Sequence, residues 1–497
     1  MKKLQILFLL IVAIITFSVS CKKNDSGNTP DPVVTKAIFK ITPDSLKFPI
    51  AGGSLTVTDS MNGSGWAAAS DQTWCTLSAN SSTSATSQIT VTTIANPYMG
   101  VRTAKLLFVM DTKTLKYVYV SQAGRTTLYP NYNTTPIAPD ITGMNSTAVQ
   151  LAAKIGLGLN LGNTMEAPGG ETGWGSPVIT ENIIKFMKQS GFNTIRIPCA
   201  WYGHMDNATD AHIKTDWLNR VKEVVAYCVN NDMYVLLNIH WDGGWLENNI
   251  PANNQAKKDS VNAMQKAFWE QIATTMRDFD EHLMFASANE PNTGTNNVGD
   301  PLKFATLLSY HQTFINAVRS TGGRNTYRSL VIQGQSDLMS TAKLPTDPTP
   351  NRMMYEEHNY TPFQFCALNG DANWGKMFYY WGAANHSTIE PDRNPDWDCE
   401  EVAHTKYFKM LKANFVDKGI PVLMGEYGAY RRDGSANIPK DLALHEKSVD
   451  YWITYVTKTA IANGVKPIWW DTGGLLDRSK LTVNDQRSLD AIIAGSK

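Results

Sequence analysis

The pattern of hydrophobic and polar positions divides the chain into two regions. Between about residues 37 and 124, short runs of β-branched and aromatic residues alternate with polar ones, and turn pairs such as Gly52-Gly53 and Asn62-Gly63 separate them. No helical period appears in this region. The pattern predicts a small all-β sandwich over residues 36–124.

Beyond residue 149, apolar runs alternate with segments of helical period, for example residues 218–228 and 261–276. Such alternation is typical of strands followed by helices. Eight apolar runs begin near Gly158, Thr194, Tyr234, Leu283, Leu330, Met353, Val422 and Pro467. Residues 149–497 are therefore predicted to form an α/β fold, a (β/α)8 TIM barrel, preceded by the sandwich.

The N-terminus has the pattern of an export signal. Two lysines precede an apolar run over residues 7–19, which is shorter than the roughly 20 residues that a membrane-spanning helix needs. The stretch Ser18-Val19-Ser20-Cys21 resembles a bacterial lipoprotein box, in which the cysteine is acylated. We expect a signal peptide over 1–20, a lipid anchor on Cys21 and an outer-membrane or cell-surface location, with plain secretion as the alternative.

Composition narrows the possible partners. Residues 21–35 are polar and predicted to be a tether, and residues 125–148, rich in Thr, Asn and Pro, a linker. Lys+Arg 45 and Asp+Glu 45 leave a formal net charge of +0, which favours a neutral polymer over nucleic acid as partner. The five other cysteines lack C-x-x-C spacing, so neither disulfides nor zinc is indicated. We expect a monomer without a cofactor.

Two glutamates end apolar runs of the barrel region, Glu290 in MFASANEP and Glu426 in VLMGEYG. A lone glutamate there could be a helix N-cap neighbour or a buried ion-pair partner. Burying a carboxylate is costly, however, and residues at the C-terminal strand ends of a barrel meet at one mouth. The two are therefore predicted to be a catalytic pair. Other strand ends carry Arg196, His240, Asn289, His358, Tyr360 and Trp470.

Seven motifs occur in order in this region: NLGNT (160–164), GFNTIRIP (191–198), LNIHWD (237–242), ANEP (288–291), HNY (358–360), GEYG (425–428) and WWD (469–471). Together they resemble glycoside hydrolase family 5. The resemblance implies that Glu290 is the acid/base and Glu426 the nucleophile of a retaining glycosidase, in which one carboxyl group protonates the leaving oxygen and the other attacks the anomeric carbon. Acid catalysis requires Glu290 to be protonated near neutral pH while Glu426 stays ionised.

The same resemblance implies roles for the neighbours of the pair. Asn289 would bind the 2-hydroxyl of the −1 sugar. Arg196 and Tyr360 would hold Glu426, and His240 and His358 would donate hydrogen bonds around the −1 sugar. Arg196 could instead be a structural ion-pair residue, and either histidine a core residue or a metal ligand, although no H-E-x-x-H motif supports metal hydrolysis.

Three further residues are candidates for substrate binding. Trp470 at the last strand end would place a flat apolar face under the −1 sugar. Trp245 is the next candidate platform. Asn163 could contact substrate or simply hold its turn.

The sandwich region resembles the BACON modules of bacterial surface proteins, through Gly52-Gly53, Trp66, DQTW (71–74), RTA (102–104) and VSQAG (120–124). It could bind sugar or act as a spacer, and Trp66 and Trp74 are predicted to be core residues. The family branch that the loops resemble implies an endo-β-1,4-glucanase acting on xyloglucan, mixed-linkage glucan or cellulose-type chains of plant cell walls. The alternatives are an endo-β-mannanase and a non-catalytic glycan-binding protein.

Overall fold

The computed structural model describes residues 37–497 except 97, 99, 112–113, 296–297, 335–342 and 435–436. The predicted signal peptide, the tether and Cys21 lie outside the described residues. The chain forms two compact units, residues 1–128 and 129–497. Within the described part, no helix is both long enough and apolar enough to cross a membrane.

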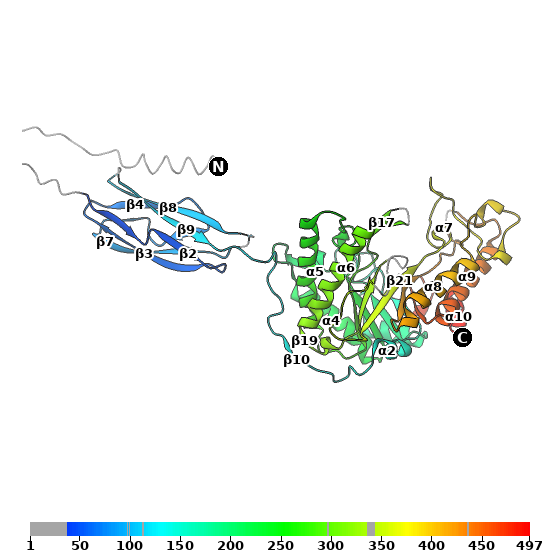
Figure 1. The fold of residues 1–497 in the computed structure, drawn as a ribbon. Helices are drawn as coiled ribbons and strands as arrows, with labels where there is room; N and C mark the ends of the chain where they lie inside the picture. Colours follow the sequence, from blue (N-terminus) through cyan, green and yellow to red (C-terminus); the bar gives the residue numbers. More distant parts are fainter. Residues whose placement is uncertain are drawn as a thin grey trace, which may run out of the picture. The chain divides into compact units, whose positions relative to one another are not determined.

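The first unit is a two-sheet β structure, as predicted (Figure 1). One sheet has the order β1 (Phe39–Thr42), β3 (Gly53–Met61), β7 (Thr86–Thr93), β5 (Cys75–Leu77). The other has the order β2 (Ser45–Phe48), β9 (Thr114–Gln122), β8 (Arg102–Met110), β4 (Trp66–Ser70), β6 (Ser81–Ser82). Inward side chains alternate with exposed ones, as the period of a strand requires.

Both tryptophans of the first unit are engaged in packing. Trp66 is buried, and its indole N–H donates to Asp59 at 2.9 Å. Trp74 packs against the core, and the guanidinium of Arg102 lies 4.1 Å from the centre of its ring. Neither ring is an open platform for a sugar.

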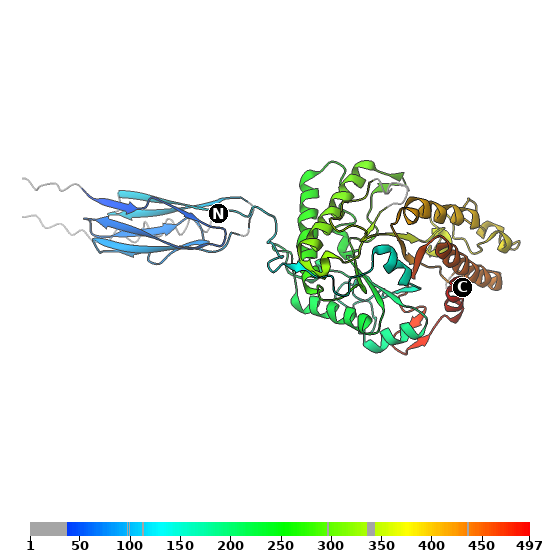
Figure 2. The same cartoon turned by 60° about the horizontal axis from the view of Figure 1, so that its bottom comes forward.

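The second unit contains a closed barrel whose eight strands are all parallel to their neighbours (Figures 1 and 2). In order they are β11 (Gly158–Asn160), β12 (Thr194–Ile197), β15 (Tyr234–Asn238), β16 (Leu283–Ala286), β20 (Leu330–Gln333), β21 (Met353–Asn359), β22 (Val422–Tyr427) and β23 (Val465–Trp469). Each begins within two residues of an apolar run identified in the sequence, so the (β/α)8 prediction is confirmed.

Helices surround the barrel (Figure 2). They include α3 (Glu181–Gln189), α4 (Thr215–Asn230), α5 (Gln255–Thr275), α6 (Pro301–Ser320), α8 (Glu401–Asn414), α9 (Leu442–Ala462) and α10 (Gln486–Gly495), with the short α7 (Phe363–Cys366) in a loop. Alternate strand residues such as Val235, Leu237 and Phe285 pack in the large core cluster with the apolar faces of these helices. The five described cysteines are all buried and unpaired.

The interior of the barrel changes in polarity along its axis. Near the N-terminal strand ends it is filled by apolar side chains, namely Leu236, Met284, Ala286, Val331, Met354, Leu423 and Ile468. One layer further toward the C-terminal ends it holds buried polar side chains, namely Asn160, Arg196, Asn238, Gln333 and Glu356. The upper layer is the floor of the barrel mouth, where such folds place their chemistry.

Helix α2 (Ala148–Lys154) closes the lower end of the barrel (Figure 1). Thr147 and Gln150 form a capping box at its start. Leu151 and Ile155 are buried in the same cluster as the apolar interior residues, whereas Val149 is 52% exposed. The helix therefore acts as an apolar plug.

Much of the expected linker 125–148 belongs to the barrel unit, which begins at Tyr129. The backbone N–H of Tyr132 donates to Glu270 at 3.0 Å. Strand β10 (Ile137–Pro139) pairs with β19 (Gly322–Gly323). The composition of this segment predicts a linker, but its polar groups form hydrogen bonds to the barrel as well as to solvent.

We predict that Leu151→Ala destabilises the barrel by about 2–5 kcal/mol, because it removes apolar volume from the plug and leaves a cavity. Val149→Ala is the matched control on the exposed face of the same helix, and its effect should stay within about 0.5 kcal/mol. Denaturant unfolding followed by barrel tryptophan fluorescence measures both. Equal effects of the two substitutions would contradict the plug.

Candidate active site

The C-terminal strand ends of the barrel surround a cavity of about 600 Å³. Six of the predicted site residues line it, namely His240, Asn289, Glu290, Tyr360, Glu426 and Trp470. Arg196 and His358 lie in the wall or floor beneath, with side chains 0% and 7% exposed. The structure therefore brings eight of the predicted site residues together at the barrel mouth.

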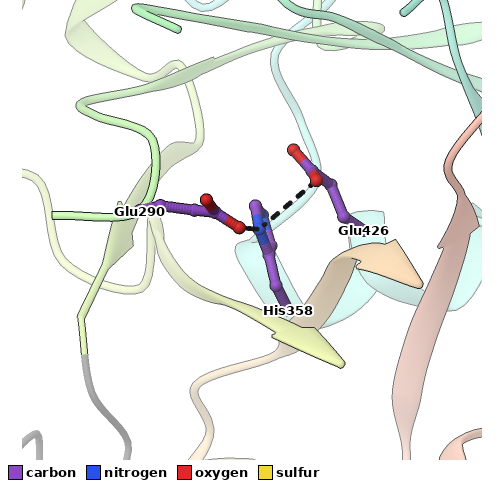
Figure 3. Close-up of side chains that lie close together, drawn as sticks. All are labelled: Glu290, His358 and Glu426. Carbon is purple, nitrogen blue, oxygen red and sulfur yellow. Dashed lines mark hydrogen bonds and ion pairs between the residues drawn. The ribbon is translucent and has the colours of Figure 1, made fainter. Parts of the chain in front are cut away.

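Glu290 and Glu426 face each other across the imidazole of His358 (Figure 3). His358 Nδ1 lies 2.9 Å from Glu290 Oε1 and 3.7 Å from Glu426 Oε2. One oxygen of each glutamate and this nitrogen all lie within 4.8 Å of one another. Glu290 is the more open of the pair, with a side chain 53% exposed against 6% for Glu426.

Arg196 ties the nucleophile candidate to the barrel floor. Its Nη1 donates to Glu426 Oε1 at 2.8 Å, and its Nε pairs with Glu356 Oε1 at 2.8 Å. Its Nη2 donates to Asn289 Oδ1 at 2.7 Å. A single guanidinium thus fixes two carboxylates and the side-chain amide beside Glu290.

Glu356 is a site residue that the sequence analysis missed. Its side chain is fully buried and accepts from His358 Nε2 at 3.2 Å. The signal was present, since Glu356 lies two positions before His358 on one strand and must point to the same side. It interrupts an apolar run with a charge that only a buried partner could stabilise.

Gly425 makes room for this buried carboxylate. A Cβ atom at position 425 would collide with Glu356 on the neighbouring strand. The pairing register of β21 with β22 also shifts between Glu357 and His358, and that of β22 with β23 shifts between Met424 and Tyr427. Irregular pairing of this kind re-aims side chains next to active sites.

The cluster holds its positive charge on His358. Burial alone would lower the pKa of His358, but Glu426, Glu290 and Glu356 raise it to about 10. Burial raises the pKa of Glu290, yet the hydrogen bond and charge of His358, together with Arg196, bring it below its usual value. Burial raises the pKa of Glu426, and His358 and Arg196 only partly oppose this.

The proton therefore lies on His358, in its hydrogen bond to Glu290. This arrangement differs from the expectation from the sequence that Glu290 itself is protonated near neutral pH. The proton on His358 also affects whether this cluster can bind a metal ion. One atom each of Glu290, His358 and Glu426 lies close enough to the others to bind one ion, and a metal ion there would have to displace the proton of His358.

Tyr360, His240 and Trp470 complete the walls. The hydroxyl of Tyr360 donates to Glu426 Oε2 at 2.9 Å, so both oxygens of Glu426 accept hydrogen bonds. The rings of His240 and Trp470 are stacked, with centres 5.7 Å apart and planes 9° from parallel. Burial, with Arg196 and His358, lowers the pKa of His240 well below its usual value, so this imidazole is neutral.

Trp245 is not a platform, which corrects the sequence prediction. It is 8% exposed, packs edge-on against Phe268 in the core, and donates its indole N–H to Asp242 at 3.2 Å. Trp241 is the exposed tryptophan of the same loop, at 48%. The assignment failed because four consecutive residues, 241–244, have positive φ, and the turn that they form reverses which side chains face the solvent.

The same turn is held by a buried carboxylate. Asp242 accepts N–H groups from Trp201 at 2.7 Å, from Gly203 at 3.2 Å and from Tyr202. Burial raises the pKa of Asp242 to about 6 against these hydrogen bonds. It clamps the loop after β15 to the loop after β12.

Asn163 does not line the cavity. It has a φ of 60°, and its backbone N–H donates to Glu166. Glu290 shares this left-handed conformation, with a φ of 42°. Non-glycine residues in this region cost free energy and often mark functional sites. The contact of Asn163 with Glu166 holds a turn, which is the alternative interpretation that the sequence left open.

Comparison with known proteins agrees with this geometry. The pattern described as "Cellulase (glycosyl hydrolase family 5)" matches residues 160–475. That of BACON, a "putative binding domain, N-terminal", matches residues 64–123. The chain is 31% identical to a xyloglucan-specific endo-beta-1,4-glucanase of Bacteroides ovatus, over 99% of this chain and 96% of that protein. It is 31% identical to endoglucanase A of Paenibacillus barcinonensis, over 74% and 95%.

Solved structures give the same result. A Bacteroides ovatus family 5 xyloglucanase in complex with a XXXG heptasaccharide superimposes with a TM-score of 0.66 at 30% identity, covering 92% of this chain and all of that one. A xyloglucan-specific β-1,4-glucanase from a ruminal metagenomic library has a TM-score of 0.64 at 36% identity, covering 71% and 96%. The chain is a glycoside hydrolase and belongs to glycoside hydrolase family 5.

Proposed function

We propose that this protein is a retaining endo-β-1,4-glucanase that hydrolyses plant cell-wall glucans, with xyloglucan as a main substrate. The observation that carries the proposal is the spacing of Glu290 and Glu426, which have oxygens within 4.8 Å of each other. Retaining enzymes place their two carboxyl groups about 5–5.5 Å apart, whereas inverting enzymes leave about 6.5–9.5 Å for a water molecule.

In the first step Glu426 attacks the anomeric carbon. Arg196 and Tyr360 hold its two oxygens and oppose the rise in its pKa that burial causes. Glu290 protonates the leaving oxygen. The proton comes from the 2.9 Å hydrogen bond between His358 and Glu290, because a bound sugar excludes water from Glu290 and raises its pKa.

In the second step a water molecule attacks the glycosyl ester on Glu426. This ester is neutral, so Glu290 alone of the pair now carries a negative charge. Glu290 then accepts a proton from the attacking water and passes it back to His358 through their hydrogen bond, which returns the site to its starting state. Microscopic reversibility assigns both proton transfers to the same residue.

The walls of the cavity support a polymer of glucose as substrate. Trp470 offers an aromatic face, and Asn289 an amide for the 2-hydroxyl of the −1 sugar. Beyond the catalytic pair the cavity continues past Phe363, Tyr430 and Leu475, which leaves room for more than one sugar. The two relatives named as xyloglucan-specific, and the solved complex with XXXG, support xyloglucan in particular.

The location of the substrate completes the proposal. Plant cell-wall glucans lie outside the cell, so the enzyme must be exported, and acylation of Cys21 would anchor it at the surface. Assaying the same hydrolase activity in membrane and soluble fractions of producing cells tests the anchor. A lipidated chain should sediment with the membranes.

The substrate assignment predicts that the purified enzyme releases oligosaccharides from xyloglucan, and also from mixed-linkage β-glucan. Product analysis on a panel of these two glucans with carboxymethylcellulose, mannan and xylan measures this. Activity confined to mannan would overturn the substrate class. Release of monosaccharides alone would overturn the endo mode of action, and no activity on any polysaccharide would favour a glycan-binding protein.

The two glutamates should fail differently when removed. Glu426→Ala should reduce turnover of all substrates by at least about 10³-fold, because no nucleophile remains. Glu290→Ala should lose about 10²–10⁴-fold on polysaccharides but keep fast glycosylation by an aryl glycoside with a good leaving group, which needs no proton.

Burst kinetics with a dinitrophenyl cellobioside, and mass spectrometry of the trapped glycosyl-enzyme, distinguish these outcomes. The control is Glu223→Ala, which removes a carboxylate from an exposed position of α4. Equal losses on both substrate types in the Glu290 variant, with no trapped intermediate, would contradict the assignment.

His358→Asn should move the acidic limb of the kcat/KM pH profile to higher pH. The imidazolium lowers the pKa of both glutamates, so its loss raises those values and the nucleophile ionises only at higher pH. A shift of about 1 unit or more is expected for an opposite charge at this range. His386→Asn, at a surface pair with Glu400, is the control and should leave the profile unchanged.

A further inference from the structure

The long loop between β21 and α8 carries two exposed aromatic side chains that the two reaction steps do not use. The loop spans residues 360–400 and holds only short helical turns, and long loops of compact domains are usually functional. Phe363 is 49% exposed and Trp374 is 63% exposed, and their ring centres lie 6.2 Å apart. An exposed apolar patch beside a cavity is typical of a ligand-binding surface.

The aromatic pair continues from the catalytic cavity. Phe363 lines that cavity together with Glu290 and Glu426. Trp374 lies next to Phe363, with its ring plane tilted by 46°, but does not line the cavity itself. A chain that leaves the cavity over Phe363 can therefore contact Trp374 next.

Backbone hydrogen bonds hold the segment that carries Trp374. Ala372 and Gly375 exchange two of them, at 3.0 and 3.1 Å, which closes a tight turn around Trp374. The N–H of Phe378 donates to the carbonyl of Gln364 at 3.1 Å and so joins this turn to α7. A platform that is already ordered loses little conformational entropy when a ligand binds.

Helix α7 is in turn anchored to the loop after β22, the strand that carries the nucleophile. The buried Arg432 donates from Nη2 to the carbonyls of Gln364 and Phe365, both at 3.3 Å. The N–H of Tyr430 donates to the carbonyl of Cys366 at 3.1 Å. The aromatic pair is therefore fixed relative to the catalytic residues.

The surroundings of the aromatic pair fit a neutral sugar chain. The charged side chains next to Trp374 in the loop form ion pairs, Lys376 with Asp392 at 3.1 Å and Asp371 with Arg393 at 2.6 Å. The C–H groups on the face of a glucose ring pack against an aromatic face. A stable protein partner would need a surface of about 800 Å² on each side, far more than two rings supply.

We propose that Phe363 and Trp374 form a binding platform for sugar units of a β-glucan chain that lie outside the catalytic cavity. The inference rests on the proposed function, because that function supplies the chain. It predicts that Trp374 contributes to the turnover of long substrates and not to that of substrates that end inside the cavity.

A comparison of a polymer with a short substrate tests this platform. Trp374→Ala should lower kcat/KM on xyloglucan by about 5–50-fold, mainly through KM, because a stacked sugar is lost. On an aryl β-cellobioside, which has only two glucose units, the loss should be at most about 2-fold. Trp374→Phe keeps a flat apolar face and should recover most of the activity on the polymer. The control is Trp397→Ala, at a position of the same loop that is 47% exposed and does not line the cavity.

A second measurement leaves both tryptophans in place. In the Glu426→Ala variant, which cannot turn substrate over, hydroxyl-radical footprinting with mass spectrometry reports the oxidation of each exposed indole. Saturating long xyloglucan oligosaccharides should protect Trp374 and leave Trp397 as reactive as before. This result remains decisive if Trp374→Ala is unstable in thermal unfolding.

Equal losses of Trp374→Ala on the polymer and on the aryl cellobioside, or no loss on either, would overturn the inference. So would an unprotected Trp374 in the footprint. A Trp374→Ala variant that keeps its turnover of xyloglucan but changes its oligomeric state would also overturn it, because the pair would then contact a second copy of the chain. Absence of wild-type activity on every β-glucan would instead overturn the proposed function.

Discussion

The site depends on one guanidinium group buried in the barrel. Arg196 has no exposure to solvent, and the cost of removing such a charge from water is offset only when the charge is paired and hydrogen-bonded. Glu356, Glu426, Asn160 and Asn289 supply those partners. The requirement extends to the whole barrel: its lower interior is apolar and closed by α2, and the polar groups are concentrated in the layer around Arg196.

The charges around Arg196 also prepare the site for its reaction. Three carboxylates, Glu290, Glu356 and Glu426, face two cations, Arg196 and His358. One negative charge therefore remains on a preformed frame, where the transition state of glycoside cleavage develops positive charge on the sugar. Fixed charges aimed at developing charge need no reorganisation during the reaction.

Much of this could be predicted from the sequence, because its signals are local. The eight apolar runs mark the strands, and a carboxylate after such a run is costly enough to reveal Glu290 and Glu426. Glu356 could also have been predicted, because it lies two residues before His358 and both side chains therefore lie on one face of the strand. Trp245 could not be placed correctly, because the left-handed turn at 241–244 decides which indole faces solvent. The proton on His358 could not be predicted from the sequence either, because it depends on the combined charge of three carboxylates that are far apart in the sequence.

The missing side chain of Gly425 has a consequence for how this site can change. The glycine exists because Glu356 fills the space beside it, and Glu356 is there because Arg196 needs a partner. Any larger residue at 425 collides with Glu356 while Glu356 stays, and shortening Glu356 first removes one of the two carboxylates that pair with the buried Arg196. The two positions are therefore epistatic, and neither can drift alone. A library that randomises position 425 without position 356 would therefore sample few variants that keep the nucleophile in place.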